Sequence, residues 1–180
     1  YRTMEVLQGR PTDESGRLEK EIAVYDLLDK LDIPFRRVDH VHADTMEMCQ
    51  EIDQALGQDI CKNLFLCNRQ KTKFYLLLMP GDKPFKTKDL SAQIGSSRLS
   101  FGGAEDMERL LNLTPGSVTV LGLMYDPDCQ VTLLIDQDLY QQSAFGCHPC
   151  INTSTVQFST ADFREKLLPA LGHPVTLVQL

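Results

Sequence analysis

Apolar residues near the start of the chain recur at helical spacing. Within residues 17–31 they stand three or four positions apart, at Leu18, Ile22, Tyr25, Leu28 and Leu31. This spacing predicts an amphipathic helix that ends before Pro34.

Shorter apolar segments predict the other elements. Continuous or alternating runs predict strands over residues 35–40, 62–67, 73–79, 118–124, 131–135 and 175–178. Helices are predicted over residues 45–56, 88–94, 105–111 and 159–168, and the last opens with the capping signal Ser159-x-x-Asp162. Because hairpin-like strand pairs outnumber regular helix–strand alternations, the pattern favours an α+β fold over a doubly wound one.

The length of 180 residues suits a single domain. Residues 1–16 are mostly polar and are expected to form an N-terminal extension, with one domain over residues 17–180. The longest apolar run, residues 74–79, is far too short to span a bilayer, so no membrane partner is expected. Without a signal segment, the six cysteines are expected to be reduced thiols of a cytoplasmic protein.

The net charge of −7 argues against nucleic acid, but basic residues are concentrated in one window. Residues 62–88 hold seven basic residues against one acid, Asp82. Such asymmetry predicts a local anion-binding face on an acidic body, although solvated turn lysines give the same pattern. Apart from Lys62, the basic residues of this window are Arg69, Lys71, Lys73, Lys83, Lys86 and Lys88.

The segment "FGCHPCINT", residues 145–153, has three interpretations. Cys147 and Cys150 form a Cys-x-x-Cys redox pair, but the β-branched residues that follow make a poor helix start, which removes the usual stabilisation of a thiolate. The same cysteines with His40-x-His42 make a set of zinc ligands, although no second close cysteine pair exists.

The third interpretation is a ligand-binding loop. Gly146 lets backbone approach a ligand, Pro149 fixes the loop, and His148 offers a hydrogen-bonding group near neutral pH. Asn152 and Thr153 add uncharged polar groups where the loop ends.

Four segments in order resemble the YbaK/prolyl-tRNA-synthetase-associated domain family, especially its free-standing, alanine-specific trans-editing members. They are "CKNLFL" (residues 61–66), "RLSF" (98–101), "PGSV" (115–118) and "HPxxNT" (148–153). The resemblance covers roughly residues 18–180. It implies a YbaK-like mixed fold with a curved, barrel-like sheet and packed helices.

The resemblance also implies a function: hydrolysis of alanine mischarged on proline-specific tRNA, without a metal or organic cofactor. The tRNA would be the main partner and prolyl-tRNA synthetase a second one. A non-catalytic relative that binds tRNA or another ligand is the alternative. The basic residues Arg69, Lys71, Lys73, Lys83, Lys86 and Lys88 become candidate tRNA contacts.

Residue by residue, the resemblance implies a catalytic group of Lys62, Gly146 and His148. Lys62 would hold the phosphate or ribose of the terminal adenosine, and backbone N–H groups of the loop would stabilise the oxyanion. Many family loops read Gly-x-x-x-Pro, whereas this chain has Gly146-x-x-Pro149. The expected substrate-binding residues are Thr45, Met46, Asn63, Ser100, Pro149, Asn152 and Thr153.

Overall fold

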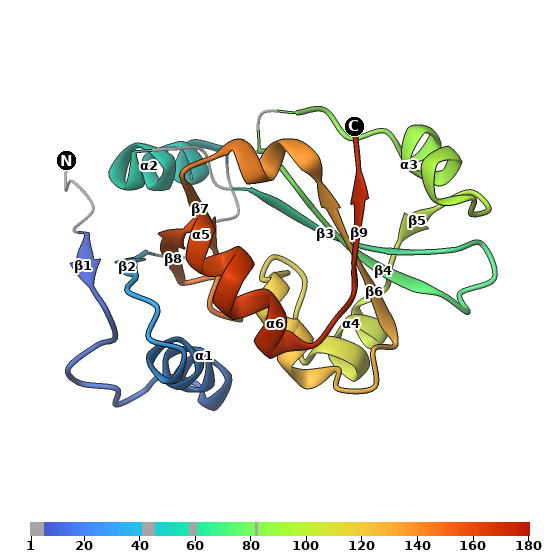
Figure 1. Ribbon diagram of the computed structural model, residues 1–180. Helices are drawn as coiled ribbons and strands as arrows, with labels where there is room; N and C mark the ends of the chain where they lie inside the picture. Colours follow the sequence, from blue (N-terminus) through green and yellow to red (C-terminus); the bar gives the residue numbers. More distant parts are fainter. Residues whose placement is uncertain (1–5, 41–45, 58–60, 82) are drawn as a thin grey trace.

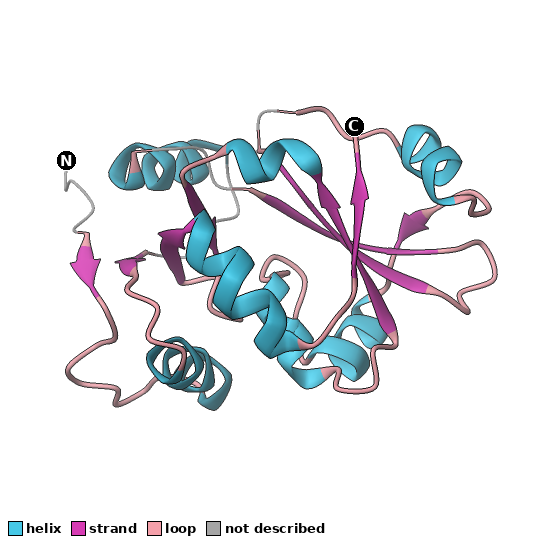
Figure 2. Ribbon diagram, in the orientation of Figure 1, coloured by secondary structure: helices cyan, strands magenta, loops and turns pink. Residues whose placement is uncertain are grey.

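The computed structural model describes residues 6–40, 46–57, 61–81 and 83–180, with residues 46–49 described by their backbone alone. Two separate β-sheets and their covering helices make a mixed fold, which confirms the predicted α+β class (Figures 1 and 2). The sheets do not close into a barrel, so the expected barrel-like sheet is not observed.

The strands are β1 (Leu7–Gln8), β2 (Arg36–Asp39), β3 (Lys62–Cys67), β4 (Phe74–Met79), β5 (Ser100–Phe101), β6 (Val131–Asp136), β7 (Ala144–Cys147), β8 (Ser154–Ser159) and β9 (Val175–Val178). The α-helices are α1 (Glu19–Lys30), α2 (Met46–Leu56), α3 (Thr87–Ile94), α4 (Ala104–Leu111), α5 (Thr160–Asp162) and α6 (Leu168–Leu171). Two 3₁₀ helices, η1 (Val120–Tyr125) and η2 (Gln137–Gln141), and a π-helical turn, η3 (Phe163–Leu167), complete the list.

The larger sheet has the strand order β5-β3-β4-β6-β9. β3 and β4 form the predicted antiparallel hairpin, and β6 and β9 continue the sheet in parallel with β4. Helices cover both faces: α3 packs on one face through Leu90, and α4 packs on the other through Leu110. Every residue of β4 is buried as a result, as is usual for a strand covered on both sides.

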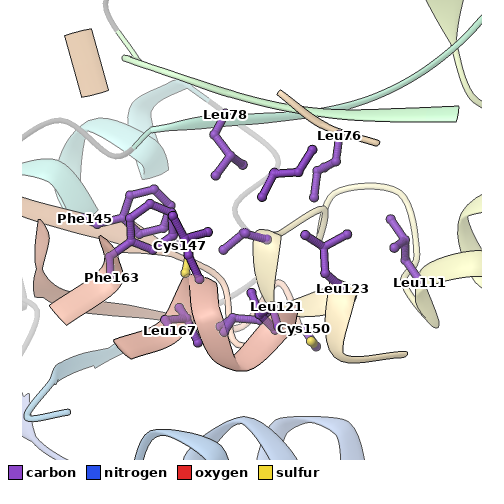
Figure 3. Close-up of a cluster of buried hydrophobic side chains, with 14 of the residues drawn as sticks. Leu76, Leu78, Leu111, Leu121, Leu123, Phe145, Cys147, Cys150, Phe163 and Leu167 are labelled. Atoms are coloured by element: carbon purple, nitrogen blue, oxygen red, sulfur yellow. The ribbon is translucent and has the colours of Figure 1, made fainter. Parts of the chain in front are cut away.

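The smaller sheet has the order β1-β2-β8-β7, and its pairs are antiparallel. β7 and β8 are a hairpin closed by residues 148–153, a region whose flanking strands the hydrophobic pattern did not predict. Phe145 of β7 stacks on Phe163 with ring centroids 4.2 Å apart, and this pair joins the hairpin to the core under Leu76 and Leu78 (Figure 3).

The strand predicted over residues 118–124 is wrong, because the chain forms the 3₁₀ helix η1 there. Thr119 begins the turn by accepting a hydrogen bond from the amide of Leu121. At Gly122, a Cβ atom would lie 2.6 Å from the Leu113 side chain, so glycine permits close packing of this turn. A short run that is apolar throughout does not distinguish a buried strand from a buried helical turn.

Helix α1 occupies the predicted region and buries Tyr25 and Leu28 as predicted, but its buried face also includes Glu21 and leaves out Leu18. Leu18 is 56% exposed, whereas Glu21 is 1% exposed. The Glu21 carboxylate accepts hydrogen bonds from the Tyr25 hydroxyl at 2.5 Å and the Arg17 guanidinium at 2.7 Å, and these partners let a charged group replace an apolar one. No helix among the described residues is long and apolar enough to cross a membrane.

Candidate active site

A cavity of about 220 Å³ lies where the two sheets meet. Its lining comes from the start of β3, the loop before η1 and the end of β7: Cys61, Asn63, Gly116, Val118, Cys147 and His148. The Cys61 thiol lies 3.3 Å from the Gly146 carbonyl oxygen and links the sheets at this point. Three of the four family-like segments, which are distant in sequence, therefore meet around one small cavity.

The backbone fixes the tautomer of His148. Its Nδ1 lies 2.8 Å from the carbonyl oxygen of Ser154, and because a carbonyl oxygen only accepts, Nδ1 carries the hydrogen. Burial lowers the pKa of His148; the bond to Ser154 opposes this effect, and the nearby His40 adds to it. The ring is therefore neutral at pH 7 with its lone pair on Nε2, the form that can take a proton from water.

A second histidine lies against this ring. His40 Nε2 is 2.9 Å from the hydroxyl of buried Thr155, and the same hydroxyl is 3.5 Å from His148 Nδ1. The two imidazole rings meet edge-on with centroids 6.1 Å apart. In the sequence, His40 is only a candidate zinc ligand beside His42, which lies outside the described residues. His40 reaches Thr155 because β2 pairs with β8. This pairing joins segments that are distant in sequence, so the local pattern could not reveal it.

Asn63 lines the cavity and also holds its wall together. Its Oδ1 accepts the backbone N–H of Val120 at 3.2 Å, which fixes the start of η1 on β3. Its Nδ2 lies 3.3 Å from both the carbonyl oxygen and the sulfur of Cys61. The contact to the carbonyl oxygen is longer than an ordinary N–H···O bond, and sulfur is a weak acceptor, so the amide N–H groups are weakly held at the edge of the cavity.

Gly146 is placed differently from the prediction. It is not a loop residue but the third residue of β7, where it lies opposite Gln157 of β8. Cys150 instead carries the left-handed backbone conformation in the connecting loop, with φ of 63°. The strand continues past Gly146 because the chain on both sides of the loop pairs as an antiparallel hairpin, a contact that local sequence does not reveal. Buried Pro149 follows the cavity residue His148. Because proline has no N–H, this residue cannot be one of the backbone donors predicted for the oxyanion.

Lys62 does not lie with His148. Neighbouring side chains in a strand point to opposite faces, and Cys61 and Asn63 point into the cavity. The half-buried Lys62 side chain instead follows the α3 face of the sheet and donates from Nζ to the carbonyl oxygen of Lys83, 2.5 Å away. In this structure, the lysine is next to the cavity in sequence but is held on the other side of its strand.

Three other expected substrate-binding residues are not placed at the cavity. Thr45 lies outside the described residues, and Met46 is described only as the backbone at the start of α2. Ser100 is exposed on β5 opposite Cys67, at the far end of β3 from Lys62. Its hydroxyl is 3.6 Å from the Cys67 sulfur.

Asn152 and Thr153 line a different and larger cavity of about 520 Å³. They share it with α1 and its preceding loop, including Arg17, and with Asp39. Arg17 binds both Asp39, at 3.0 Å, and Glu21. Burial raises the pKa of Asp39, but hydrogen bonds from Arg17 and Arg37 outweigh it and lower that pKa to about 2. The charges on this wall are thus largely neutralised by one another.

Cys147 and Cys150 are buried components of the core (Figure 3). Burial raises the pKa of each thiol to about 12, and it raises that of Cys61 as well. Neutral thiols are poor nucleophiles and poor metal ligands, which disfavours the redox and zinc interpretations. In the part of the chain that the structure describes, no group of three or more His, Cys, Asp or Glu side chains could hold a metal ion.

The basic window is divided by the β3–β4 hairpin. Exposed Arg69, Lys71 and Lys73 lie at the hairpin turn, and exposed Lys86 and Lys88 lie at the start of α3. Lys83 differs, because its ammonium binds buried Asp136 at 3.0 Å, Asp138 at 2.6 Å and the Leu180 carbonyl oxygen at 3.0 Å. These bonds give Lys83 an internal role, since an unpaired Asp136 carboxylate would be costly to bury; its contact with tRNA stays a prediction.

Comparisons with known proteins agree with the geometry. The model of the family described as "Aminoacyl-tRNA editing domain" matches residues 40–166. "Prolyl-tRNA editing protein ProX" of Acetoanaerobium sticklandii is 31% identical over 163 residues, which cover 91% of this chain and 99% of that protein. "Prolyl-tRNA synthetase associated domain-containing protein 1" of Danio rerio is 28% identical, with 89% and 86% covered.

A solved structure has the same fold. It is described as a candidate trans-editing enzyme for prolyl tRNA synthetase and superposes with a TM-score of 0.64 at 16% identity, covering 91% of this chain and 98% of that one. With the family model matching well over half of the sequence, the chain belongs to the aminoacyl-tRNA editing domain family.

Proposed function

We propose that this protein hydrolyses the ester of alanine mischarged on proline-specific tRNA, acting in trans on the released tRNA. As a member of its family, the chain is an aminoacyl-tRNA deacylase, a hydrolase of a carboxylic ester. One observation carries the proposal: a cavity of about 220 Å³ contains a histidine whose free ring nitrogen is a base at neutral pH.

Proline-specific tRNA that carries alanine arises by error during the synthesis of prolyl-tRNA. A site built for proline excludes a smaller amino acid poorly, because each missing methylene is worth only about 1–3 kcal/mol. A second, smaller site that admits alanine and rejects proline corrects this error. The cavity's lining by Val118, Cys61 and Cys147 suits a small apolar side chain.

The reaction needs only an oriented water and a base. A water molecule attacks the ester carbonyl carbon while His148 Nε2 takes its proton. The tetrahedral intermediate then collapses, the ribose oxygen leaves with that proton, and free alanine and uncharged tRNA remain. We assign stabilisation of the oxyanion to the amide N–H groups of Asn63, which lie at the cavity edge in weak contacts.

Lys62 has a binding role in this proposal. Its flexible stem starts beside Cys61 at the cavity, and among the described residues its ammonium donates to one carbonyl oxygen, that of Lys83. Moving from that oxygen to the phosphate or ribose of the terminal adenosine exchanges a neutral acceptor for an anionic one, which makes a stronger hydrogen bond. Contact with prolyl-tRNA synthetase belongs to the same proposal and would deliver mischarged tRNA; co-purification of the two proteins tests it.

A panel of charged tRNAs tests the proposed function. Purified protein is mixed with proline-specific tRNA carrying alanine, serine, glycine or proline, and the loss of each ester is followed over time. We expect rapid loss of alanine and little loss of proline. Equal hydrolysis of all four esters would contradict the size-selective site, and no hydrolysis of any would contradict the enzyme.

A further inference from the structure

Two aromatic rings meet on the surface of the larger sheet, away from the cavity. Phe101 is 62% exposed on β5, which is an edge strand. Its ring meets that of partly buried Phe85 edge-on, with centroids 6.1 Å apart. Because Phe101 lies opposite Leu66 in the antiparallel pair, it shares the α3 face of the sheet, and α3 and β5 lie at the same end of the molecule (Figure 1).

Three cations lie close in sequence to this aromatic pair. Lys86 follows Phe85 directly, Lys88 lies in the first turn of α3, and Arg98 precedes β5. All three side chains are exposed, and among the described residues none of them forms an ion pair. Asp89 is the only acid between residues 83 and 101. An exposed ring flanked by cations suits single-stranded nucleic acid, whose bases stack on aromatics while its phosphates bind Lys and Arg.

The pair lies on the same face of the sheet as Lys62, the residue proposed to hold the terminal adenosine. Lys62 and Leu66 are on the same face of β3, four residues apart, which is roughly 13 Å at ~3.3 Å per residue. Phe101 is opposite Leu66, and Lys62 is bonded to the segment that carries Phe85. A short single strand covers this distance, since stacked nucleotides advance about 3.4 Å each.

We propose that Phe85 and Phe101 form a stacking platform for a base in the unpaired 3′ end of the tRNA, upstream of the charged nucleotide. Lys86, Lys88 and Arg98 bind the phosphates on either side. This platform rests on the proposed function, which supplies the tRNA and places its charged end near Lys62. A protein partner on the same patch is disfavoured because the surrounding unpaired cations would lose water without gaining an anion.

Phe101→Ala, compared with Leu177→Ala, tests the platform. Leu177 is 49% exposed on β9, the opposite edge of the same sheet, so it is a matched loss of an exposed apolar side chain. We expect Phe101→Ala to raise KM for alanyl-tRNA about 5- to 160-fold, the range for loss of one base–aromatic stack, with little change in kcat. Phe101→Trp, which keeps an aromatic ring, should have a KM close to that of the wild type, and so should Leu177→Ala.

A truncated substrate separates the platform from the cavity. On 3′-O-alanyl adenosine, which has no upstream nucleotide, Phe101→Ala should differ from the wild type no more than Leu177→Ala does. An equal loss on both substrates would overturn the platform by placing the effect in the cavity or the fold. So would unchanged KM for alanyl-tRNA, or a dimer in light scattering that Phe101→Ala dissociates.

Direct binding keeps the test independent of catalysis. Fluorescence anisotropy with a labelled, uncharged single-stranded RNA of the tRNA 3′-end sequence should show weaker binding to Phe101→Ala than to the wild type or Leu177→Ala. If the wild type hydrolyses no ester but this difference persists, the proposed function fails and the platform stands. Equal binding by all three proteins overturns the platform alone.

Discussion

Replacing His148 with alanine removes the one cavity group assigned to take a proton from water. General base catalysis contributes roughly 10²–10⁴-fold in rate, which is about 3–5 kcal/mol of activation free energy at 1.36 kcal/mol per decade. We therefore expect kcat/KM for alanyl-tRNA to fall by about two to four orders of magnitude. The same change leaves the Ser154 carbonyl oxygen without its donor, at a cost of roughly 1–3 kcal/mol in folding stability.

His148→Asn separates these two effects. Its amide can still donate to the Ser154 carbonyl oxygen, so folding should be closer to that of the wild type, but it cannot take a proton. Initial rates with labelled alanyl-tRNA, together with thermal melting of each variant, give both quantities. A well-folded His148→Asn protein with near-wild-type kcat/KM would refute the assignment of His148 as the base.

The pH dependence of kcat/KM in the wild type tests the same assignment of His148 as the base. Burial lowers the pKa of His148, so the neutral ring that we propose to act as the base persists below the ordinary histidine pKa of about 6.5. After subtraction of spontaneous hydrolysis, kcat/KM should stay level from pH 8 to about 6.5 and decline only at lower pH. His40→Gln removes one contribution to the lowered pKa and should move this decline toward higher pH.

The paired cysteines provide a control within the same loop. Cys147→Ser with Cys150→Ser should retain most activity, because a neutral thiol has no task in the attack of water on an ester. Both positions are buried, at 1% and 0% exposure, so each serine hydroxyl needs a partner and melting must be checked first. If the double variant folds but is inactive while His148→Ala is active, the cysteines and not His148 carry out the catalysis.

Three further outcomes follow from the contacts. Lys62→Ala should lower kcat/KM for alanyl-tRNA strongly at unchanged melting temperature, and near-wild-type kinetics would remove it from the site. Lys86→Glu with Lys88→Glu should raise KM and reduce the salt dependence of tRNA binding, whereas binding that ignores salt would mark these lysines as solvated surface. Asp126→Asn should lower the melting temperature by several degrees in calorimetry, because buried Asp126 accepts bonds from His173 and the amides of Gln130 and Val131; an unchanged melt would contradict that role.

The local hydrophobic pattern predicted those elements whose burial it reflects directly. The β3–β4 hairpin is correct because its strands are short apolar runs joined by a polar turn. They did not predict β7, because Ala144 to Cys147 is stabilised by pairing with β8 and by the Phe145–Phe163 stack. The buried Glu21 likewise depends on Arg17 and Tyr25 and contradicts the simple apolar face.

The candidate site was predictable in composition but only partly in position. The family-like segments supplied Asn63 and His148, which the structure brings together. Thr155 was missed because a threonine in a β-branched run carries no local signal, and His40 was considered only as a zinc ligand with His42. The basic window appeared as one face in the sequence, yet Lys83 is taken up by Asp136, which is distant in sequence.

The position of His148 argues for a site that is ordered before substrate arrives. It follows directly on β7, and its Nδ1 is bonded to Ser154, the first residue of β8, so both ends of the loop hold the ring. The hairpin itself is anchored in the core by Phe145 and joined to the larger sheet through Cys61 and Gly146. A histidine held by two strands loses little conformational freedom on binding, which under the proposed mechanism reduces the entropy cost of orienting a water toward the ester. Lys62 contrasts with it: in the part of the chain that the structure describes, its long side chain is held by one bond to a carbonyl oxygen, which the proposed contact with the tRNA would replace.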